Sequence, residues 1–278
     1  MLVAMRLAPV NPADLLLIAG RYAFAPTYPA VPGAEGVGEV LAVGAGVTDL
    51  VPGMRVLPLT RGNWTSHRLL PAADLVPVPA GLADAQAALL RINPATAWRL
   101  LHMVPLRAGD PVLLNAPGSG VAGLVRHFAA GLGVPVIDIG RAGSGHTFCD
   151  GPDLAARLAA RCAVLALDCV AGEATGRLAA CLAPGGTLLV YGHLSGQPCQ
   201  VPSTLLTGRG LSIRGFSLRP AEAADPDIRG FYRMLAARLD GMPLIAPVRG
   251  VWPLSALGEA VTAARGPGAG RVLLDLAA

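Results

Sequence analysis

The stretch Gly118-Ser119-Gly120-Val121-Ala122-Gly123 decides the fold of this chain, because of what surrounds it. The apolar run before it, residues 111–117, is typical of a strand, and residues 124–134 have the composition of a helix that closes on glycine. The next apolar run, residues 135–139, again predicts a strand. In this context the G-x-G-x-x-G spacing predicts a dinucleotide site. The glycines let the backbone approach a pyrophosphate, and the helix N-terminus offers free N–H groups and a positive dipole end.

The end of the second strand, Asp138-Ile139-Gly140-Arg141, distinguishes two nicotinamide cofactors. An acidic residue here would bind the ribose 2′-hydroxyl of NAD, whereas an arginine suits the 2′-phosphate of NADP. If Gly140 holds the deciding position, no carboxylate repels a phosphate and Arg141 can bind it through two hydrogen bonds. If Asp138 ends the strand, NAD is preferred and Arg141 is a solvated loop charge. We expect NADP(H), with Asp138 buried or turned away.

Composition excludes several classes of function. The 278 residues suffice for one large or two modest domains. The net charge of +4 comes from scattered arginines without any lysine, which argues against nucleic-acid binding and rules out Schiff-base chemistry on a side chain. No run approaches the 18 or more apolar residues of a membrane span, and no cationic start precedes an apolar leader. We therefore expect a cytoplasmic protein without a membrane span.

The five cysteines are dispersed and form no C-x-x-C pair: Cys149, Cys162, Cys169, Cys181 and Cys199. An odd, scattered set is typical of reduced thiols rather than of disulfides. It also argues against zinc, which needs clustered soft or imidazole ligands. We expect each cysteine to fill a small space in the core and no metal to be bound.

Turn and periodicity signals divide the chain into segments. Residues 1–90 contain short strands at 37–44 and 55–59, with one early helix that begins at Asn11-Pro12 and ends at Gly20. Residues 92–215 alternate helix and strand, which predicts a parallel sheet. The remainder has two amphipathic helices, near 227–240 and 254–265, and a last strand that begins at Arg271.

These segments resemble the medium-chain dehydrogenase/reductases. The resemblance is carried first by residues 11–14, Gly33-Ala34-Glu35-Gly36-Val37-Gly38, residues 52–56 and the glycine turn. Further segments resemble the NADPH-dependent 2-enoyl thioester reductases of that superfamily; they are residues 20–22, 62–64, 93–97, 168–172, 191–195 and 214–216. The zinc-dependent members would carry histidine where this chain has Ala34, so the zinc-free branch is the one that it resembles.

The resemblance implies an α/β protein with two domains. A Rossmann-type NADP-binding domain would span residues 92–215. A GroES-like, β-rich catalytic domain would span residues 1–91 and resume at residues 216–278. The implied reaction is NADPH-dependent reduction of a trans-2-enoyl thioester, with the acyl group carried on coenzyme A or acyl-carrier protein.

The resemblance also implies the site residues. Tyr22 would donate a hydrogen bond to the substrate, although a phenol in this loop with Phe24 and Tyr28 could simply be packing. Trp64 would line the substrate pocket, or else lie in the core. The cofactor would be bound by Asn93, Gly118, Ser119, Gly120, Val121, Arg141, Tyr191, Gly192, His193, Leu194, Phe216, Ser217, Leu218 and Arg271. His193 stands where a glycine is usual, and we expect its backbone rather than its ring to meet the cofactor.

Two departures from the family pattern matter. Only ten residues precede Asn11, where the family has some 30 that supply the opening strands, so the first domain is expected to be incomplete and to leave unpaired edges. No helix is expected after Arg141, because residues 143–148 run directly toward the next strand and parallel neighbours normally need a long crossover. The sheet is expected to lose or misplace a strand there. A second subunit could cover the open edges, which favours a homodimer.

Two other functions fit the same residues. One is a related zinc-free reductase of quinones, alkenals or a biosynthetic intermediate. The other is a shortened, non-catalytic NADPH-binding protein, which the two departures favour and an intact Tyr22 disfavours.

Overall fold

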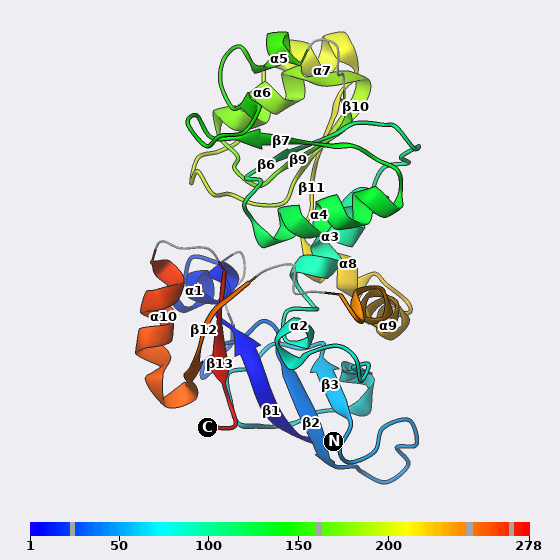
Figure 1. The fold of residues 1–278 in the computed structure, drawn as a ribbon, viewed down its shortest axis with the longest axis vertical. Helices are drawn as coiled ribbons and strands as arrows, with labels where there is room; N and C mark the ends of the chain where they lie inside the picture. Colours follow the sequence, from blue (N-terminus) through cyan, green and yellow to red (C-terminus); the bar gives the residue numbers. More distant parts are fainter. Residues whose placement is uncertain (23–25, 159–162, 243–246, 267–269) are drawn as a thin grey trace. The chain divides into compact units, whose positions relative to one another are not determined.

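The computed structural model describes residues 1–22, 26–158, 163–242, 247–266 and 270–278 (Figure 1). The chain forms two compact units. The first joins residues 1–95 to residues 224–278, and the second consists of residues 96–223. The first unit is thus built from both ends of the chain, and the second is one continuous insertion between them.

The first unit is built on a seven-stranded sheet in the order β12-β13-β1-β2-β3-β5, with β4 also paired to β1. Its strands are β1 (Leu2–Pro9), β2 (Val37–Ala42), β3 (Arg55–Pro58), β4 (His67–Leu69), β5 (Leu75–Pro77), β12 (Val248–Pro253) and β13 (Arg271–Asp275). Its helices are α1 (Pro12–Ile18), α2 (Asp84–Ala87), α9 (Ile228–Leu239) and α10 (Leu257–Arg265), and α3 (Asn93–His102) begins in it. The expected early helix, strands and tail helices are all present.

The opening strand β1 was not expected. It pairs antiparallel with β2 on one side and with β13 on the other, so it lies inside the sheet rather than at an edge. Val3 and Met5 alternate with less buried neighbours, which is the pattern of a strand with one face on the core. The prediction that the first domain has unpaired strand edges because few residues precede Asn11 is therefore wrong. Residues 2–9 themselves form the strand between β2 and β13.

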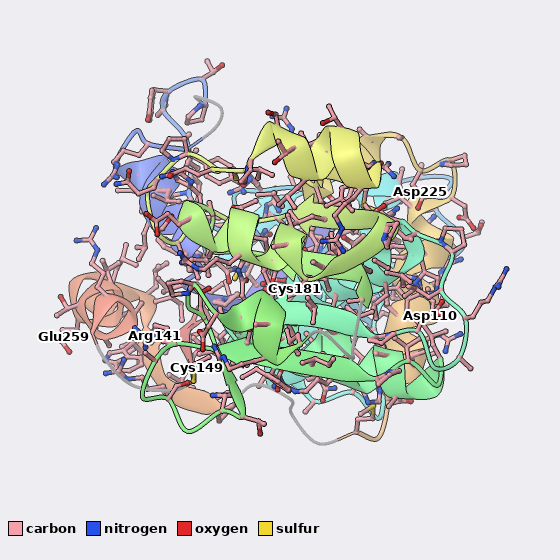
Figure 2. The ribbon with its side chains drawn as sticks, turned by 90° about the horizontal axis from the view of Figure 1, so that it is seen from above. Asp110, Arg141, Cys149, Cys181, Asp225 and Glu259 are labelled. Carbon is pink, nitrogen blue, oxygen red and sulfur yellow. The ribbon has the colours of Figure 1, made fainter. Side chains whose placement is uncertain are left out.

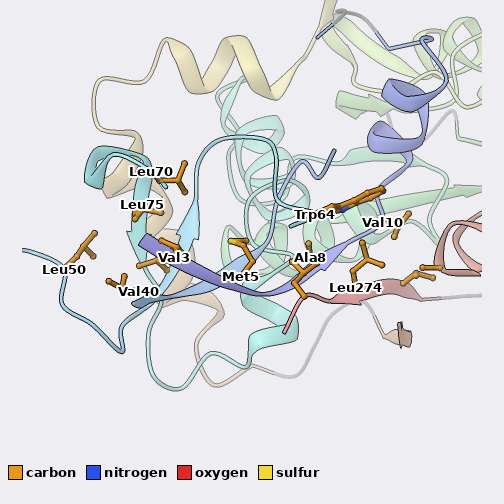
Figure 3. Packing of buried hydrophobic residues seen from close by; sticks show 14 residues of the cluster. Val3, Met5, Ala8, Val10, Val40, Leu50, Trp64, Leu70, Leu75 and Leu274 are labelled. Atoms are coloured by element: carbon orange, nitrogen blue, oxygen red, sulfur yellow. The ribbon is translucent and has the colours of Figure 1, made fainter. Parts of the chain in front are cut away.

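The core of the first unit lies against this sheet (Figure 3). Val3 and Met5 from β1, Val40 from β2 and Leu274 from β13 belong to one buried cluster. A large apolar side chain buried in this way contributes about 1.5–3 kcal/mol. The packing therefore joins the start of the chain to its last strand.

The second unit contains a six-stranded sheet in the order β11-β10-β9-β6-β7-β8, and every neighbouring pair is parallel. Its strands are β6 (Val112–Asn115), β7 (Val136–Gly140), β8 (Phe148–Cys149), β9 (Ala163–Asp168), β10 (Leu182–Val190) and β11 (Ser212–Gly215). Its helices are α4 (Gly120–Gly131), α5 (Leu154–Arg157), α6 (Glu173–Ala180), α7 (Ser203–Arg209) and α8 (Leu218–Ala223). This is the Rossmann-type parallel sheet that the glycine turn predicts.

The connection from β7 to β8 contains no helix, as expected, yet the next strand is retained. Ile139 pairs with Phe148 in parallel register, although only residues 141–147 separate the two strands. Gly143 and Gly145 both have φ of +76°, a left-handed conformation that glycine adopts without strain, and they turn the loop back along the sheet edge. The prediction of a lost strand is therefore wrong, and the sheet keeps β8 as a strand of two residues.

Candidate active site

The glycine turn lies between β6 and α4. Ser119 caps the helix, because its Oγ accepts a hydrogen bond from the backbone N–H of Ala122 at 3.2 Å. A Cβ at Gly118 would meet no described atom within 4 Å, so this point of the turn is open to a ligand. Ala116 has a φ of +50°, which is strained for a residue other than glycine. The turn therefore presents a helix N-terminus suited to an anion.

A buried carboxylate holds the two strands beside this turn together. Asp168, at the end of β9, accepts a hydrogen bond from Asn115 Nδ2, at the end of β6, at 2.6 Å. Asn115 Oδ1 in turn accepts from the backbone N–H of Cys169 at 2.9 Å. Asp168 also accepts from Thr175 Oγ1 at 2.6 Å and from the N–H of Ala171, whose φ is +65°. Neither Asn115 nor Asp168 was predicted to have a role, although a polar residue ends each apolar strand.

Tyr191 brings an unsatisfied hydroxyl to the same place. It follows β10, and its buried Oη has no hydrogen-bond partner among the described residues. The hydroxyl lies beside Cys169 and Ser119, and burial raises the pKa of Tyr191 well above its ordinary value. A buried polar atom without a partner is costly unless a ligand supplies one. Tyr191 therefore fits a polar ligand bound at the glycine turn.

The segment after Tyr191 lies against the end of β9. Leu194 N–H donates to the carbonyl of Cys169 at 3.0 Å, and a Cβ at Gly192 would lie 2.7 Å from that carbonyl oxygen. His193 is exposed, and its backbone carbonyl accepts from Gly196 in a turn. The close approach requires glycine at position 192, and the loop can present its backbone to a ligand.

Several predicted cofactor residues of the second unit follow the carboxyl ends of its parallel strands. In a parallel sheet all carboxyl ends lie on the same side, and ligands bind there. Ser119 follows β6, Arg141 follows β7, Tyr191 follows β10 and Phe216 follows β11. Ser217 is exposed, and Leu218 begins α8. Their contact with a cofactor stays a prediction.

Arg141 and Asp138 differ in what they contact. β7 ends at Gly140, and Arg141 is exposed and forms no ion pair with any described residue (Figure 2). Asp138 is partly exposed rather than buried, but its carboxylate accepts two hydrogen bonds from Arg126 Nη1 of α4, at 2.9 and 3.1 Å. Asp138 is therefore neutralised by a partner.

In the first unit, Tyr22 belongs to a charged network. Arg61 Nη2 donates to Tyr22 Oη at 3.4 Å, and the guanidinium lies 5.1 Å from the centre of the phenol ring. Arg61 Nη1 reaches Oδ1 of the buried Asp14 at 3.4 Å. Burial raises the pKa of Asp14 to about 6, although the hydrogen bond from Asn11 N–H and the charge of Arg61 both lower it. Phe24, named beside Tyr22 in the packing alternative, lies outside the described residues.

Glu35 is a second fully buried carboxylate of the first unit. It accepts hydrogen bonds from Asn11 Nδ2 at 3.0 Å and from the backbone N–H of Ile92 at 2.7 Å. Burial raises the pKa of Glu35 to about 7, and these hydrogen bonds and the nearby charge of Arg271 only partly offset it. Arg271, predicted to reach the cofactor, lies near Glu35, and burial lowers the pKa of its guanidinium.

Two further predicted site residues lie in the first unit. Trp64 is 5% exposed and packs in the core cluster, where its Nε1 donates to the carbonyl of Pro9 at 3.1 Å. This position favours the core alternative over a pocket aromatic. Asn93 is the first residue of α3 and is partly exposed, so its role as a polar anchor stays a prediction.

The cysteines divide into two groups. Cys169 and Cys181 are buried and form no disulfide with a described residue, as expected of core residues. Cys149 is half-buried and Cys199 is exposed, so the prediction that every cysteine fills the core is wrong for these two. Cys162 lies outside the described residues. Within the described ranges, no group of three or more His, Cys, Asp or Glu side chains could hold a metal ion, and no helix is long and apolar enough to cross a membrane.

Comparison with known proteins defines the family. Residues 1–80 match the alcohol dehydrogenase GroES-like domain. Human mitochondrial enoyl-acyl-carrier-protein reductase is 37% identical over 246 residues, which are 78% of this chain and 64% of that protein. The corresponding Dictyostelium discoideum reductase is 34% identical over 242 residues, which are 78% of this chain and 69% of that protein. The chain thus spans about two thirds of the length of these relatives.

A solved structure agrees with these matches. A Bacillus thuringiensis protein assigned as an NADPH:quinone reductase superposes with a TM-score of 0.88 at 30% identity, covering 99% of this chain and 89% of that one. The chain belongs to the medium-chain dehydrogenase/reductase superfamily, in the group that contains the enoyl thioester reductases.

The expectation of a cytoplasmic protein is contradicted by these relatives, because the curated reductases are mitochondrial proteins. The reason for the error is physical. Dispersed thiols argue against an oxidising compartment, but they do not separate the cytoplasm from the interior of an organelle.

Proposed function

We propose that this protein reduces the carbon–carbon double bond of a trans-2-enoyl thioester with NADPH. The observation that carries the proposal is Tyr22, a phenol held beside the Arg61 guanidinium in the GroES-like unit. The similarity to enoyl-acyl-carrier-protein reductases over 246 residues supports the substrate class. The open glycine turn and the unsatisfied Tyr191 hydroxyl support the cofactor.

The proposed reaction needs a hydride at the β carbon, a hydrogen-bond donor at the thioester oxygen and a proton at the α carbon. Bound NADPH supplies the hydride. As the β carbon gains this hydride, the double-bond electrons move toward the thioester carbonyl, whose oxygen becomes negative. Tyr22 Oη donates a hydrogen bond to that oxygen, which lowers the barrier because the charge is largest in the transition state. A proton from water then completes the saturated product at the α carbon.

The preference for NADPH over NADH follows from the end of β7. The strand ends at Gly140, the carboxylate of Asp138 is held by Arg126, and Arg141 is exposed directly after the strand. Arg141 would bind the 2′-phosphate, and the backbone of Gly118–Val121 would receive the pyrophosphate. Arg141→Ala should raise the KM for NADPH about tenfold or more and leave that for NADH nearly constant. Arg107→Ala, which removes another exposed arginine of the same unit, is the control.

A related reductase of quinones or alkenals is the second candidate, because the Bacillus thuringiensis relative is assigned as an NADPH:quinone reductase. Both candidates use the same cofactor site, so only the substrate separates them. The deciding experiment measures NADPH oxidation with short and medium-chain trans-2-enoyl-coenzyme A, and in parallel with a benzoquinone. Turnover of the thioesters alone supports the first function, and turnover of the quinone alone replaces it with the second.

We also propose that the protein forms a homodimer. β11 is an edge strand of the six-stranded sheet, and Ser212, Arg214 and Gly215 in it are exposed. An exposed edge presents unpaired backbone groups that can continue a sheet with a second copy. This open edge supports the proposal.

A further inference from the structure

Arg61 touches both Tyr22 and a buried acid. Its two terminal nitrogens point to different partners, Nη2 to the phenol oxygen and Nη1 to the carboxylate of Asp14, each at 3.4 Å. The guanidinium plane is rigid, so holding one nitrogen fixes the other. The three residues come from different segments: Asp14 from α1, Tyr22 from the loop after it and Arg61 from the loop after β3.

The backbone at Arg61 is itself fixed by a second arginine. Arg68 Nη2 donates to the carbonyl of Arg61 at 2.7 Å, and Arg68 Nη1 donates to Asn63 Oδ1 at 2.7 Å. Asn63 Nδ2 donates to the carbonyl of Gly33 at 3.1 Å. The loop that carries Arg61 is therefore tied to the body of the unit, and the contacts of the guanidinium with Tyr22 and Asp14 set the direction of its side chain.

Asp14 anchors the other end of the contact. It is 0% exposed and lies in the first turn of α1, where Oδ2 accepts from the backbone N–H of Asn11 at 3.2 Å. This bond caps the helix and leaves Oδ1 directed at Arg61. A buried carboxylate is stable as an anion only with such partners, and the charge of Arg61 favours the anion of Asp14.

We propose that Arg61 is a positioning residue for Tyr22, and that Asp14 acts through Arg61. The inference rests on the proposed function, because it concerns how Tyr22 acts on a thioester. Tyr22 Oη accepts a hydrogen bond from Arg61, and a phenol oxygen that accepts one hydrogen bond can donate its own proton in another, here to the substrate oxygen. The adjacent positive charge also stabilises the negative charge that the phenol oxygen gains as it donates.

A double-mutant cycle tests the kinetic part. Arg61→Leu is expected to lower kcat by about tenfold to a hundredfold, the value of a charge-assisted hydrogen bond, and to leave the KM for NADPH unchanged. In a Tyr22→Phe background the same change should lower kcat less than twofold, because the hydroxyl is already gone. The kcat of Arg61→Lys should fall between those of the parent protein and Arg61→Leu, since lysine keeps the charge but cannot contact two partners through a planar guanidinium. Arg265→Leu, an exposed arginine of α10, is the charge-matched control. Equal losses in both backgrounds would overturn the proposal.

A spectroscopic measurement keeps the test independent of turnover. The chain has four tyrosines, so fluorotyrosine labelling gives four ¹⁹F resonances, assigned by single Tyr→Phe changes. Arg61→Leu should move the Tyr22 resonance and leave that of the fully buried Tyr232 in place, which also reports that the unit is folded. If the chemical shift of the Tyr22 resonance is unchanged in Arg61→Leu, the inference is overturned. If the protein reduces no enoyl thioester, the proposed function fails, and the ¹⁹F shift still decides whether Arg61 holds the phenol.

Discussion

Tyr22 carries the proposed chemistry through one oxygen atom, so removing that atom is the sharpest single change. Tyr22→Phe keeps the ring that lies beside Arg61 and deletes only the donor. We expect kcat for a trans-2-enoyl thioester to fall about a hundredfold, the usual contribution of one positioned donor, with little change in the KM for NADPH. Tyr28→Phe, which removes a hydroxyl from a residue that is 68% exposed, should have no effect. Unchanged turnover in Tyr22→Phe would end the assignment of Tyr22 as donor.

Glu35 makes the stability of the first unit depend on pH. Its pKa is raised from 4.5 to about 7 in the folded protein, mainly by burial. Between these values the folded state holds a proton that the unfolded state has released, so the free energy of unfolding falls as pH rises. The loss amounts to about 3 kcal/mol from this group, and Asp14 acts in the same direction.

Glu35→Gln isolates this effect, because glutamine does not titrate. Urea unfolding at pH 5 and pH 8 should show a smaller decrease in stability for Glu35→Gln than for the parent protein. Glu259→Gln changes an exposed acid of α10 and should leave the decrease as it was. An identical pH dependence in all three proteins would mean that Glu35 is not the group responsible.

At the scale of elements, Asp168 joins β6, β9 and α6. Asp168→Ala would leave the side chains of Asn115 and Thr175 and the N–H of Ala171 without their acceptor. We expect the free energy of unfolding to fall by about 3 kcal/mol or more, because several buried donors lose their partner together. Asp168→Asn keeps one carbonyl oxygen and should cost roughly 1 kcal/mol. Thermal unfolding of the two variants compares them directly, and equal losses would contradict this account.

Local patterns made several elements predictable. The glycine turn between β6 and α4 and the cap at Asn11 each depend on a few neighbouring residues, so their spacing alone was sufficient. The contacts of Arg61 with Tyr22 and with Asp14 were not predictable, because they join residues 39 and 47 positions apart whose charges show no local pattern. β8 was missed for a different reason, since two residues are too few to show an alternation.

The long-range pairing within the first sheet was harder to predict than its individual elements. β1 was overlooked because only ten residues precede Asn11, which was thought too few for an opening strand. These residues do form a strand, and it pairs with β13 from the other end of the chain. A pairing between residues 7–9 and 273–275 leaves no signal in either segment alone. Register over such a distance is fixed by the shared core rather than by local sequence.

Self-association is the prediction that belongs to the molecule as a whole. A homodimer would have twice the monomer mass of 28.2 kDa. Sedimentation equilibrium at micromolar protein should show that doubled mass, and dilution should not dissociate it if the β11 edges pair. A single species at the monomer mass across the concentration range would refute the proposed dimer.

Because the connection between β7 and β8 is short, we expect β8 to open more often than the central strands of the second unit. β8 is held by two residue pairs at the sheet edge, and residues 141–147 form no helix over it. Segments with so few contacts open locally long before the whole domain unfolds, so the amides at 148–150 should exchange with deuterium earlier than those of β6 and β9. NADPH bound by Arg141 would slow this exchange, because a ligand that prefers the closed form stabilises it. Exchange rates unchanged by NADPH would place the cofactor elsewhere. The loss of one helix would thus make cofactor binding a step that also orders this edge.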